Sequence, residues 1–298
     1  MTMMRHAQTL VQGGRLLTRH RLCTRQLSTA ATSAQQRVPI LIYHHVYRED
    51  AEELQRATFE TGSGVIGEAM FRRQMDYLRD QQVSVVGTSD VIAWINGARE
   101  LPEKAAVLHF DNGWLDSFTV VAPILQEYGY TATLFPITDG LEAASRGEAA
   151  AVRTVTEGVV SKPFMTWAQA RELQDKYGWE MGGHTATHCK IAEHHAEHGD
   201  AGVITEAETS NKLFEQHLGA PPAHFAYPSG SRTSRTDDLL LRDVGNGSGY
   251  YDSLRLWEVS IPPEIEWKFT SRDTPLHAIE GQNIDLRVPF EDFAKIFD

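Results

Sequence analysis

Short, almost continuous apolar runs constrain the fold of this chain more than any other feature. Residues 38–43 (VPILIY) and 105–110 (AAVLHF) are two of them, and neither shows the alternation of a half-exposed strand. Such runs are typical of parallel strands that are covered on both faces. Between them lie segments with apolar residues at helical spacing, as in residues 68–82. The pattern therefore indicates alternating strands and helices.

The alternation continues along most of the chain. Strands are predicted at residues 38–43, 83–86, 105–110, 132–137, 179–181 and 223–227, and helices at 68–82, 89–98, 123–128, 166–177, 203–218 and 237–244. Thr166 and Gln169 form a capping box at the start of one helix. Polar and reactive residues gather after the strands, which predicts a single α/β barrel domain over residues 38–298. The weakly patterned segment 139–161 is expected to be a lid or an insertion.

The amino-terminal segment differs in composition from the rest. Residues 1–37 contain six arginines and no acidic residue, whereas the whole chain has a formal net charge of -12. This segment resembles a mitochondrial transit peptide, and a disordered extension is the alternative. No apolar core of about 7 to 15 residues follows the arginines, so we do not expect a secretory signal. No run of about 18 apolar residues predicts a transmembrane segment.

The composition of residues 38–298 narrows the possible partners. Net negative charge argues against nucleic acid as a partner, because phosphate binding requires basic patches. Neutral ligands such as sugars remain compatible with it. The two cysteines, Cys23 and Cys189, are too few for a disulfide framework.

Two motifs carry the chemistry. Residues 109–114 (HFDNGW) place Asp111 and Asn112 after a predicted strand, and residues 184–188 (HTATH) place two histidines four apart. A carboxylate, an amide and a histidine pair are suitable for a metal-assisted hydrolytic site, in which three protein ligands leave room for water and substrate. Asn112 is unusual because an amide offers the metal only a neutral oxygen.

Six segments in order, YHHV, HFDNGW, MTWAQ, GGHTATH, FAYPSG and LRVPF, resemble the NodB-type polysaccharide deacetylases of carbohydrate esterase family 4. The resemblance covers residues 38–298 and is strongest to the branch that acts on poly-N-acetylglucosamine. It implies a distorted (β/α) barrel of about seven strands. It also implies removal of N-acetyl groups from an amino-sugar polymer or oligomer.

The resemblance assigns a role to individual residues. Asp111 would be the catalytic base and His44 the general acid, while His184, His188 and Asn112 would hold a divalent metal. Zn²⁺ is the first expectation for that metal, with Co²⁺, Ni²⁺ or Fe²⁺ as alternatives. The residues expected at the oxyanion or substrate are Ser229, Tyr227 and Trp114.

The chain also departs from the family pattern. Asn112 stands where the family has a carboxylate, which raises the formal charge of the metal site from +1 to +2. Many members place a base-orienting arginine at the position of Ala226 and an aromatic residue at that of Ser229. Arg287, in LRVPF, is the predicted replacement for the missing arginine.

Several nearby residues favour a structural interpretation. His45 would point away from His44 along a strand and is expected in the core or behind the site. Asp116 is expected to cap the following helix. The cluster His194, His195 and His198 lies in a polar run and is predicted to be solvated surface. Among the tryptophans, Trp114 and Trp257 are the candidates for a sugar-binding groove.

Three functions are compatible with the sequence. The first is metal-dependent deacetylation of N-acetylglucosamine-type polymers or oligomers. The second is hydrolysis of another amide, an ester or a cyclic ureide on the same fold. The third is a catalytically silent carbohydrate-binding relative, in which Asn112 marks lost activity. Family members usually work outside the cytoplasm, which disagrees with the amino-terminal segment, and the oligomeric state is not predicted.

Overall fold

The structure is a computed structural model of the 298-residue chain. It describes residues 36–60, 64–154, 158–243, 245, 247–257 and 265–298. Residues Gln36–Asp298 form one compact unit. The predicted transit peptide or extension at residues 1–37 therefore lies almost entirely outside the described residues.

A parallel sheet forms most of a barrel. Its strands run in the order β12-β1-β5-β6-β9, and β4 pairs with β5 at the amino end of that strand. The bounds are β1 (Ile40–Tyr43), β4 (Ser84–Val85), β5 (Ala105–Asn112), β6 (Thr133–Pro136), β9 (Glu180–Met181) and β12 (Gln282–Asn283). All of these pairings are parallel, as the continuous apolar runs predict.

Two further strands close the barrel. β10 (His224–Ala226) and β11 (Ser253–Arg255) pair in parallel. A parallel bridge between Gly183 and Phe225 joins this pair to the end of β9, and a bridge between Arg255 and Ile279 joins it to the segment that leads into β12. Seven strands of the described residues thus form a ring with two weak junctions. This arrangement confirms the predicted distorted (β/α)7 barrel.

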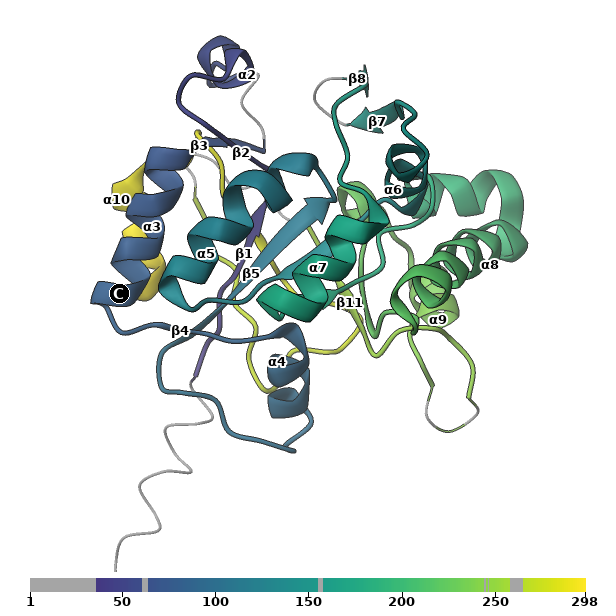
Figure 1. The fold of residues 1–298 in the computed structure, drawn as a ribbon. Coiled ribbons are helices and arrows are strands. Elements are labelled where there is room, and N and C mark those ends of the chain that lie inside the picture. Colours follow the sequence, from purple (N-terminus) through teal and green to yellow (C-terminus); the bar gives the residue numbers. More distant parts are fainter. Residues whose placement is uncertain (1–35, 61–63, 155–157, 244, 246, 258–264) are drawn as a thin grey trace, which may run out of the picture. The chain divides into compact units, whose positions relative to one another are not determined.

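Helices cover the outside of the barrel (Figure 1). Their bounds are α3 (Glu68–Asp80), α4 (Thr88–Ile95), α5 (Ala122–Tyr128), α6 (Thr138–Ser145), α7 (Trp167–Tyr177), α8 (Ile191–Leu218), α9 (Ser234–Leu240) and α10 (Phe290–Ala294). The predicted capping box of Thr166 and Gln169 is present at the start of α7. α8 begins well before the predicted residue 203 and is kinked at Gly199, whose φ is +65°.

Small elements rise beyond the carboxyl ends of the barrel strands, where α2 and the β7–β8 hairpin stand apart in Figure 1. The bounds are β2 (His45–Tyr47), α2 (Glu52–Arg56), β3 (Val65–Gly67), β7 (Val152–Thr154) and β8 (Gly158–Val160), with short helical turns at Ser117–Val121, Pro228–Gly230 and Lys295–Phe297. The segment predicted as a lid or insertion therefore contains most of α6 and a hairpin, with residues 155–157 outside the described part.

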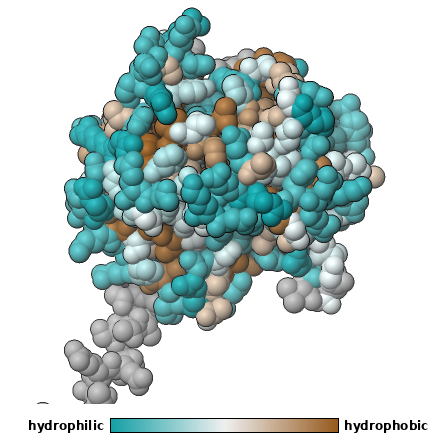
Figure 2. Space-filling view, in the orientation of Figure 1, coloured by the Kyte–Doolittle hydropathy of each residue, from teal (hydrophilic) through white to brown (hydrophobic). Residues whose placement is uncertain are grey.

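The face of the molecule seen in Figure 2 is mostly hydrophilic, with apolar side chains in scattered patches. Within the described residues, only Phe59 and Val159 are large hydrophobic side chains that are exposed. Every residue of β5 is buried, as expected for the centre of a covered sheet. No helix of the described residues combines the length and the apolar character needed to cross a membrane.

We expect Gly113 to be intolerant of a side chain. Its φ is +83°, and a Cβ would lie 2.7 Å from Leu141 Cδ1 and 2.8 Å from Pro136 Cβ. Gly129 is the matched control, since its φ is +68° and a Cβ would meet nothing within 4 Å. Gly129→Ala should lower the free energy of unfolding by about 1–2 kcal/mol through the backbone alone. Gly113→Ala should lower the free energy of unfolding by this amount and by about 1–3 kcal/mol more, because the added methyl group overpacks the turn.

Urea unfolding of both variants measures this difference. Equal losses of stability would contradict the tight packing of the turn that follows β5.

Candidate functional site

The site begins where β5 ends. Asp111 and Asn112 are its last two residues, and both are buried. Neighbouring residues of a strand normally face opposite sides. Here Asn112 has a φ of +76° and Gly113 of +83°, so the backbone turns at once. Asparagine tolerates this left-handed conformation better than most residues. Because of this turn, the Asn112 side chain need not point to the side of the sheet opposite to Asp111.

Asp111 forms a buried ion pair with Arg255. Arg255 Nη2 donates to both carboxylate oxygens, at 2.7 Å to Oδ1 and 2.6 Å to Oδ2, and the two side chains are 3% and 2% exposed. Burial by itself would raise the pKa of Asp111, but the charge of Arg255, with smaller effects of His184 and His44, lowers that pKa to about 2. Asp111 is therefore an ionised acceptor at neutral pH.

Arg255 corrects the prediction made for Arg287. Arg287 binds Asp285 instead, with Nε 2.9 Å from Oδ1 and Nη2 2.6 Å from Oδ2. In the parallel pairing of β10 with β11, Arg255 is the register partner of Ala226, the position where many family members have the arginine. The guanidinium therefore reaches Asp111 from the neighbouring strand. Its charge also lies over the Phe135 ring, 5.0 Å from the centroid.

The two predicted metal-binding histidines lie together and present the same nitrogen. His184 Nδ1 is 2.8 Å from the carbonyl oxygen of Ala226, and His188 Nδ1 is 2.8 Å from that of Arg153. Each Nδ1 therefore carries the proton it donates, which leaves the Nε2 lone pair for a ligand. The ring centroids are 5.1 Å apart. Burial lowers the pKa of His188 and brings that of His184 to about 3, so both rings are neutral at neutral pH.

The third predicted ligand also offers a free acceptor. Asn112 Oδ1 is buried and has no hydrogen-bond partner among the described residues. An acceptor buried without a partner is costly, and a cation would satisfy it. Two neutral imidazole nitrogens and one amide oxygen form a donor set that suits a divalent transition metal. The residues present thus fit the metal that the family resemblance implies.

The loop between the two histidines is held by Glu206 of α8 and by α6. Glu206 accepts hydrogen bonds from the amides of Ala186, at 3.0 Å, and Thr187, at 3.2 Å. The amide of Thr138 donates to the Thr185 carbonyl at 3.4 Å, and the next amide of α6 donates to the Ala186 carbonyl at 3.1 Å. Thr185 and His188 both have positive φ, at +67° and +64°. Strained backbone at a functional loop requires support of this kind.

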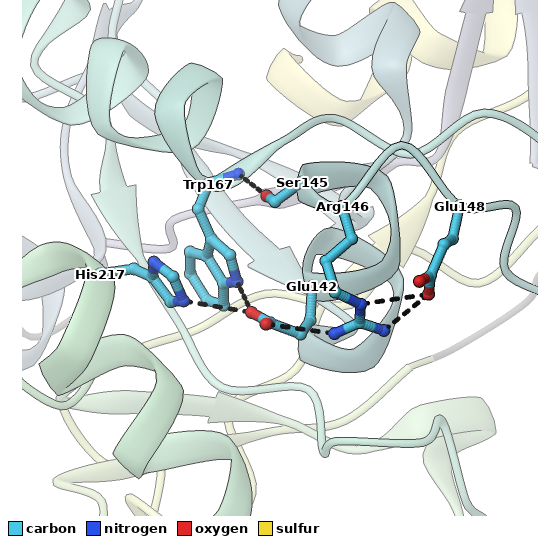
Figure 3. A network of polar contacts seen from close by, with 6 residues as sticks. All are labelled: Glu142, Ser145, Arg146, Glu148, Trp167 and His217. Carbon is cyan, nitrogen blue, oxygen red and sulfur yellow. Dashed lines mark hydrogen bonds and ion pairs between the residues drawn. The ribbon is translucent and has the colours of Figure 1, made fainter.

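α6 is in turn fixed by the polar network of Figure 3. The Glu142 carboxylate accepts from Trp167 Nε1 of α7 at 3.1 Å and lies 3.1 Å from His217 Nε2 of α8. The Trp167 and His217 rings stack with centroids 4.8 Å apart. Arg146 of the same helix region pairs with Glu142 from the other side. One carboxylate therefore joins α6 to α7 and α8, and α6 and α8 are the helices that hold the histidine loop.

His44 also lies close to Asp111. Its Nε2 lies 4.0 Å from Asp111 Oδ2, and burial lowers its pKa to about 4 although Asp111 acts in the other direction. Half-buried Trp257 lies beside it, with ring centroids 6.3 Å apart. The His44 side chain remains 18% exposed. His44, Asp111 and the His184–His188 pair therefore converge, whereas their chemical roles stay predictions.

Two aromatic residues predicted at the oxyanion or substrate have buried side chains. The Trp114 ring is 1% exposed and packs between His45 and Phe164, with centroids at 4.8 Å and 4.4 Å, so it cannot form a groove wall. Tyr227 is equally buried; its hydroxyl donates to Asp237 at 2.8 Å and its amide donates to the Arg255 carbonyl at 3.0 Å.

Other predictions near the site have mixed outcomes. Ser229 has a φ of +56° in the turn after β10, and its oxyanion role stays a prediction. Asp116 does not cap a helix through its side chain; it binds His45 Nδ1 at 3.0 Å and the amide of Val46 at 2.8 Å. His45 is therefore held behind the site, as predicted.

Comparisons with known proteins identify the family. Residues 98–245 match the family model described as polysaccharide deacetylase. The chain is 32% identical over 114 residues to a poly-beta-1,6-N-acetyl-D-glucosamine N-deacetylase of Escherichia coli (strain K12), which covers 38% of this chain and 16% of that protein. It is 20% identical over 200 residues to the protein YxkH of Bacillus subtilis (strain 168), which covers 67% of this chain and 59% of that protein. The chain thus spans less than two thirds of both relatives.

Solved structures share the fold. The Streptococcus pyogenes deacetylase PplD has a TM-score of 0.66 at 19% identity, covering 88% of this chain and 98% of that one. A de-N-acetylase from Aggregatibacter actinomycetemcomitans has a TM-score of 0.66 at 21% identity, covering 87% and 99%. The chain carries a polysaccharide deacetylase domain of the NodB type.

We expect Arg255 to be essential for the stability of the site. Arg255→Gln would leave the Asp111 carboxylate buried without its ion-pair partner and should lower the free energy of unfolding by about 3–5 kcal/mol. Arg235→Gln is the control, because its ion pair with Asp200 joins side chains that are 54% and 42% exposed. An exposed pair contributes about 0–1 kcal/mol.

Chemical denaturation of the two variants compares these losses. Similar small changes in both would show that Asp111 does not depend on Arg255.

Proposed function

We propose that the chain is a metal-dependent hydrolase that removes N-acetyl groups from an amino-sugar polymer or oligomer of the N-acetylglucosamine type. Two observations carry this proposal: the orphaned acceptor of Asn112, which directly follows Asp111 in β5, and a pair of histidines whose Nδ1 atoms are both occupied. These three side chains would hold the cation through Asn112 Oδ1 and the two Nε2 atoms. When bound, a divalent cation supplies positive charge that polarises a carbonyl and acidifies water.

Asp111 would act as the base. Its carboxylate is ionised and lies within the electrostatic influence of His184 and His188, so it can accept a proton from water that attacks the acetyl carbon. Arg255 fixes the orientation of the carboxylate through both oxygens. Because its low pKa makes Asp111 a weak base, it must hold the proton only briefly.

His44 would protonate the leaving amine. Its pKa of about 4 means that it is neutral before reaction and must receive a proton before it donates one. The 4.0 Å separation from Asp111 Oδ2 provides a short route for the proton removed from water. Amide hydrolysis requires such an acid because an amine is a poor leaving group. His44 is partly exposed, so it can also reach the substrate.

The proposed substrate follows from the family and from one side chain. The relative from E. coli is named for poly-beta-1,6-N-acetyl-D-glucosamine. In this chain Trp257 is half-buried beside His44, and its Nε1 lies 3.5 Å from Asn283 Oδ1. An aromatic ring fixed next to the reacting groups can pack against the apolar face of a sugar.

We expect Asp111→Asn to slow acetate release strongly. Loss of the base should reduce the rate by about 10²–10⁴-fold. Asp116→Asn is the control, since that carboxylate binds His45 and not the reacting groups. The measurement is acetate released from N-acetylglucosamine oligomers, with and without a chelator. Acetate release that survives both Asp111→Asn and chelation would refute the mechanism, and none from the wild type would favour a silent relative.

Asn112→Asp tests whether residue 112 is a ligand. A carboxylate in place of the amide adds a negative charge at the cation, so Zn²⁺ affinity should rise by at least about tenfold, which corresponds to about 1.4 kcal/mol. Isothermal titration with Zn²⁺ measures the change. An affinity equal to that of the wild type would remove Asn112 from the ligand set without affecting the role of the histidines.

A further inference from the structure

A second group of metal-binding side chains lies behind the histidine loop. It consists of Cys189, His194 and Glu206, whose ligand atoms all lie within 4.8 Å of one another. None of them belongs to the predicted catalytic set. We propose that this group, named the rear cluster, is a second cation site for a zinc-like metal, separate from the site at His184, His188 and Asn112.

The donor types support a metal of this class. A thiolate, an imidazole and a carboxylate are common ligands of Zn²⁺. Burial and the neighbouring Glu206 raise the pKa of Cys189 to about 12, so a cation would have to displace the thiol proton. The resulting thiolate and the Glu206 carboxylate would then neutralise the charge of a divalent cation. Bonds of about 2.0–2.3 Å in a tetrahedral site place ligand atoms about 3.3–3.8 Å apart, so only a small closure of the side chains is needed.

The fold brings the three residues together through the kink of α8. Cys189 immediately precedes this helix and its N-cap Lys190, His194 lies in its first turns, and Glu206 lies beyond the kink at Gly199. Gly202 allows the two parts of the helix to approach, since a Cβ there would lie 3.1 Å from His194 Nε2. His194, which the sequence predicts to be solvated surface, is half-buried at this cluster.

The rear cluster is joined to the loop that carries the predicted catalytic ligands. Glu206 Oε2 accepts from the amides of Ala186 and Thr187, and its Oε1 accepts from Thr187 Oγ1 at 3.0 Å. Each oxygen of a carboxylate can also contact a cation while it accepts a hydrogen bond. A cation at the rear cluster would therefore tie the start of α8, its second half and the histidine loop to one point.

Cobalt spectroscopy can separate the two sites. The chain has two cysteines, so Cys23→Ser leaves Cys189 as the single thiol. Titration of this full-length protein with Co²⁺ under reducing conditions should produce a thiolate-to-cobalt charge-transfer band in the near ultraviolet. The predicted catalytic set contains no sulfur and cannot produce this band. The band should disappear in Cys23→Ser/Cys189→Ser and persist in Cys23→Ser/His184→Ala.

Two histidine variants, one inside the rear cluster and one outside it, test whether His194 binds the metal. In the Cys23→Ser background, His194→Gln should weaken the Co²⁺ affinity read from the band by at least about tenfold. His277→Gln, which removes a half-buried imidazole outside the cluster, should leave it unchanged. Circular dichroism confirms that each variant is folded. Absence of the band, or an affinity that is indifferent to His194→Gln, would overturn the proposal, and neither result depends on deacetylase activity.

Discussion

The buried ion pair between Asp111 and Arg255 is the interaction on which the site depends. A carboxylate at 2% exposure would not remain ionised without a partner, because burial disfavours its charge. The pair also joins β5 to β11 across the interior of the barrel, where β11 is otherwise connected by short pairings. Barrel closure and the ionisation state of the proposed base therefore rest on the same contact. Two buried nitrogens of Arg255, Nε and Nη1, have no hydrogen-bond partner among the described residues.

Backbone strain is concentrated at the motifs. Of the five non-glycine residues with positive φ in the described part, Asn112, Thr185, His188 and Ser229 belong to segments that carry the family resemblance. Such conformations persist only where the surroundings determine them. Here the support is visible: Glu206 and the amides of α6 hold the histidine loop, and Glu142 holds α6 against α7 and α8. The strained backbone of the histidine loop is therefore held in place by hydrogen bonds from helices α6 and α8.

The sequence predicts five of the seven ring strands, because those strands are buried and appear as apolar runs. It does not predict β11 and β12, which are buried but short and largely polar. Asp111 and the histidine pair are predictable, since each follows a strand at the same end of the sheet. Arg255 is not, because its role depends on the register of β10 with β11, which no local pattern contains. A lone arginine in the short strand Ser253–Arg255 was the available signal. The burial of Trp114 and Tyr227 is not predictable either, because a motif does not show which side of the backbone is covered.

Asn112 changes the charge balance of the whole site. Asp111 is neutralised by Arg255 and Asp285 by Arg287, while burial keeps His184 and His188 neutral. With an amide as the third ligand, no side chain in the proposed set compensates the charge of a divalent cation. The cation would therefore be held less tightly than by a carboxylate, and it would act more strongly on a neighbouring carbonyl for the same reason. The hydrogen bonds that orient both imidazoles then become the main determinants of its retention, because they fix the two remaining lone pairs before the cation arrives.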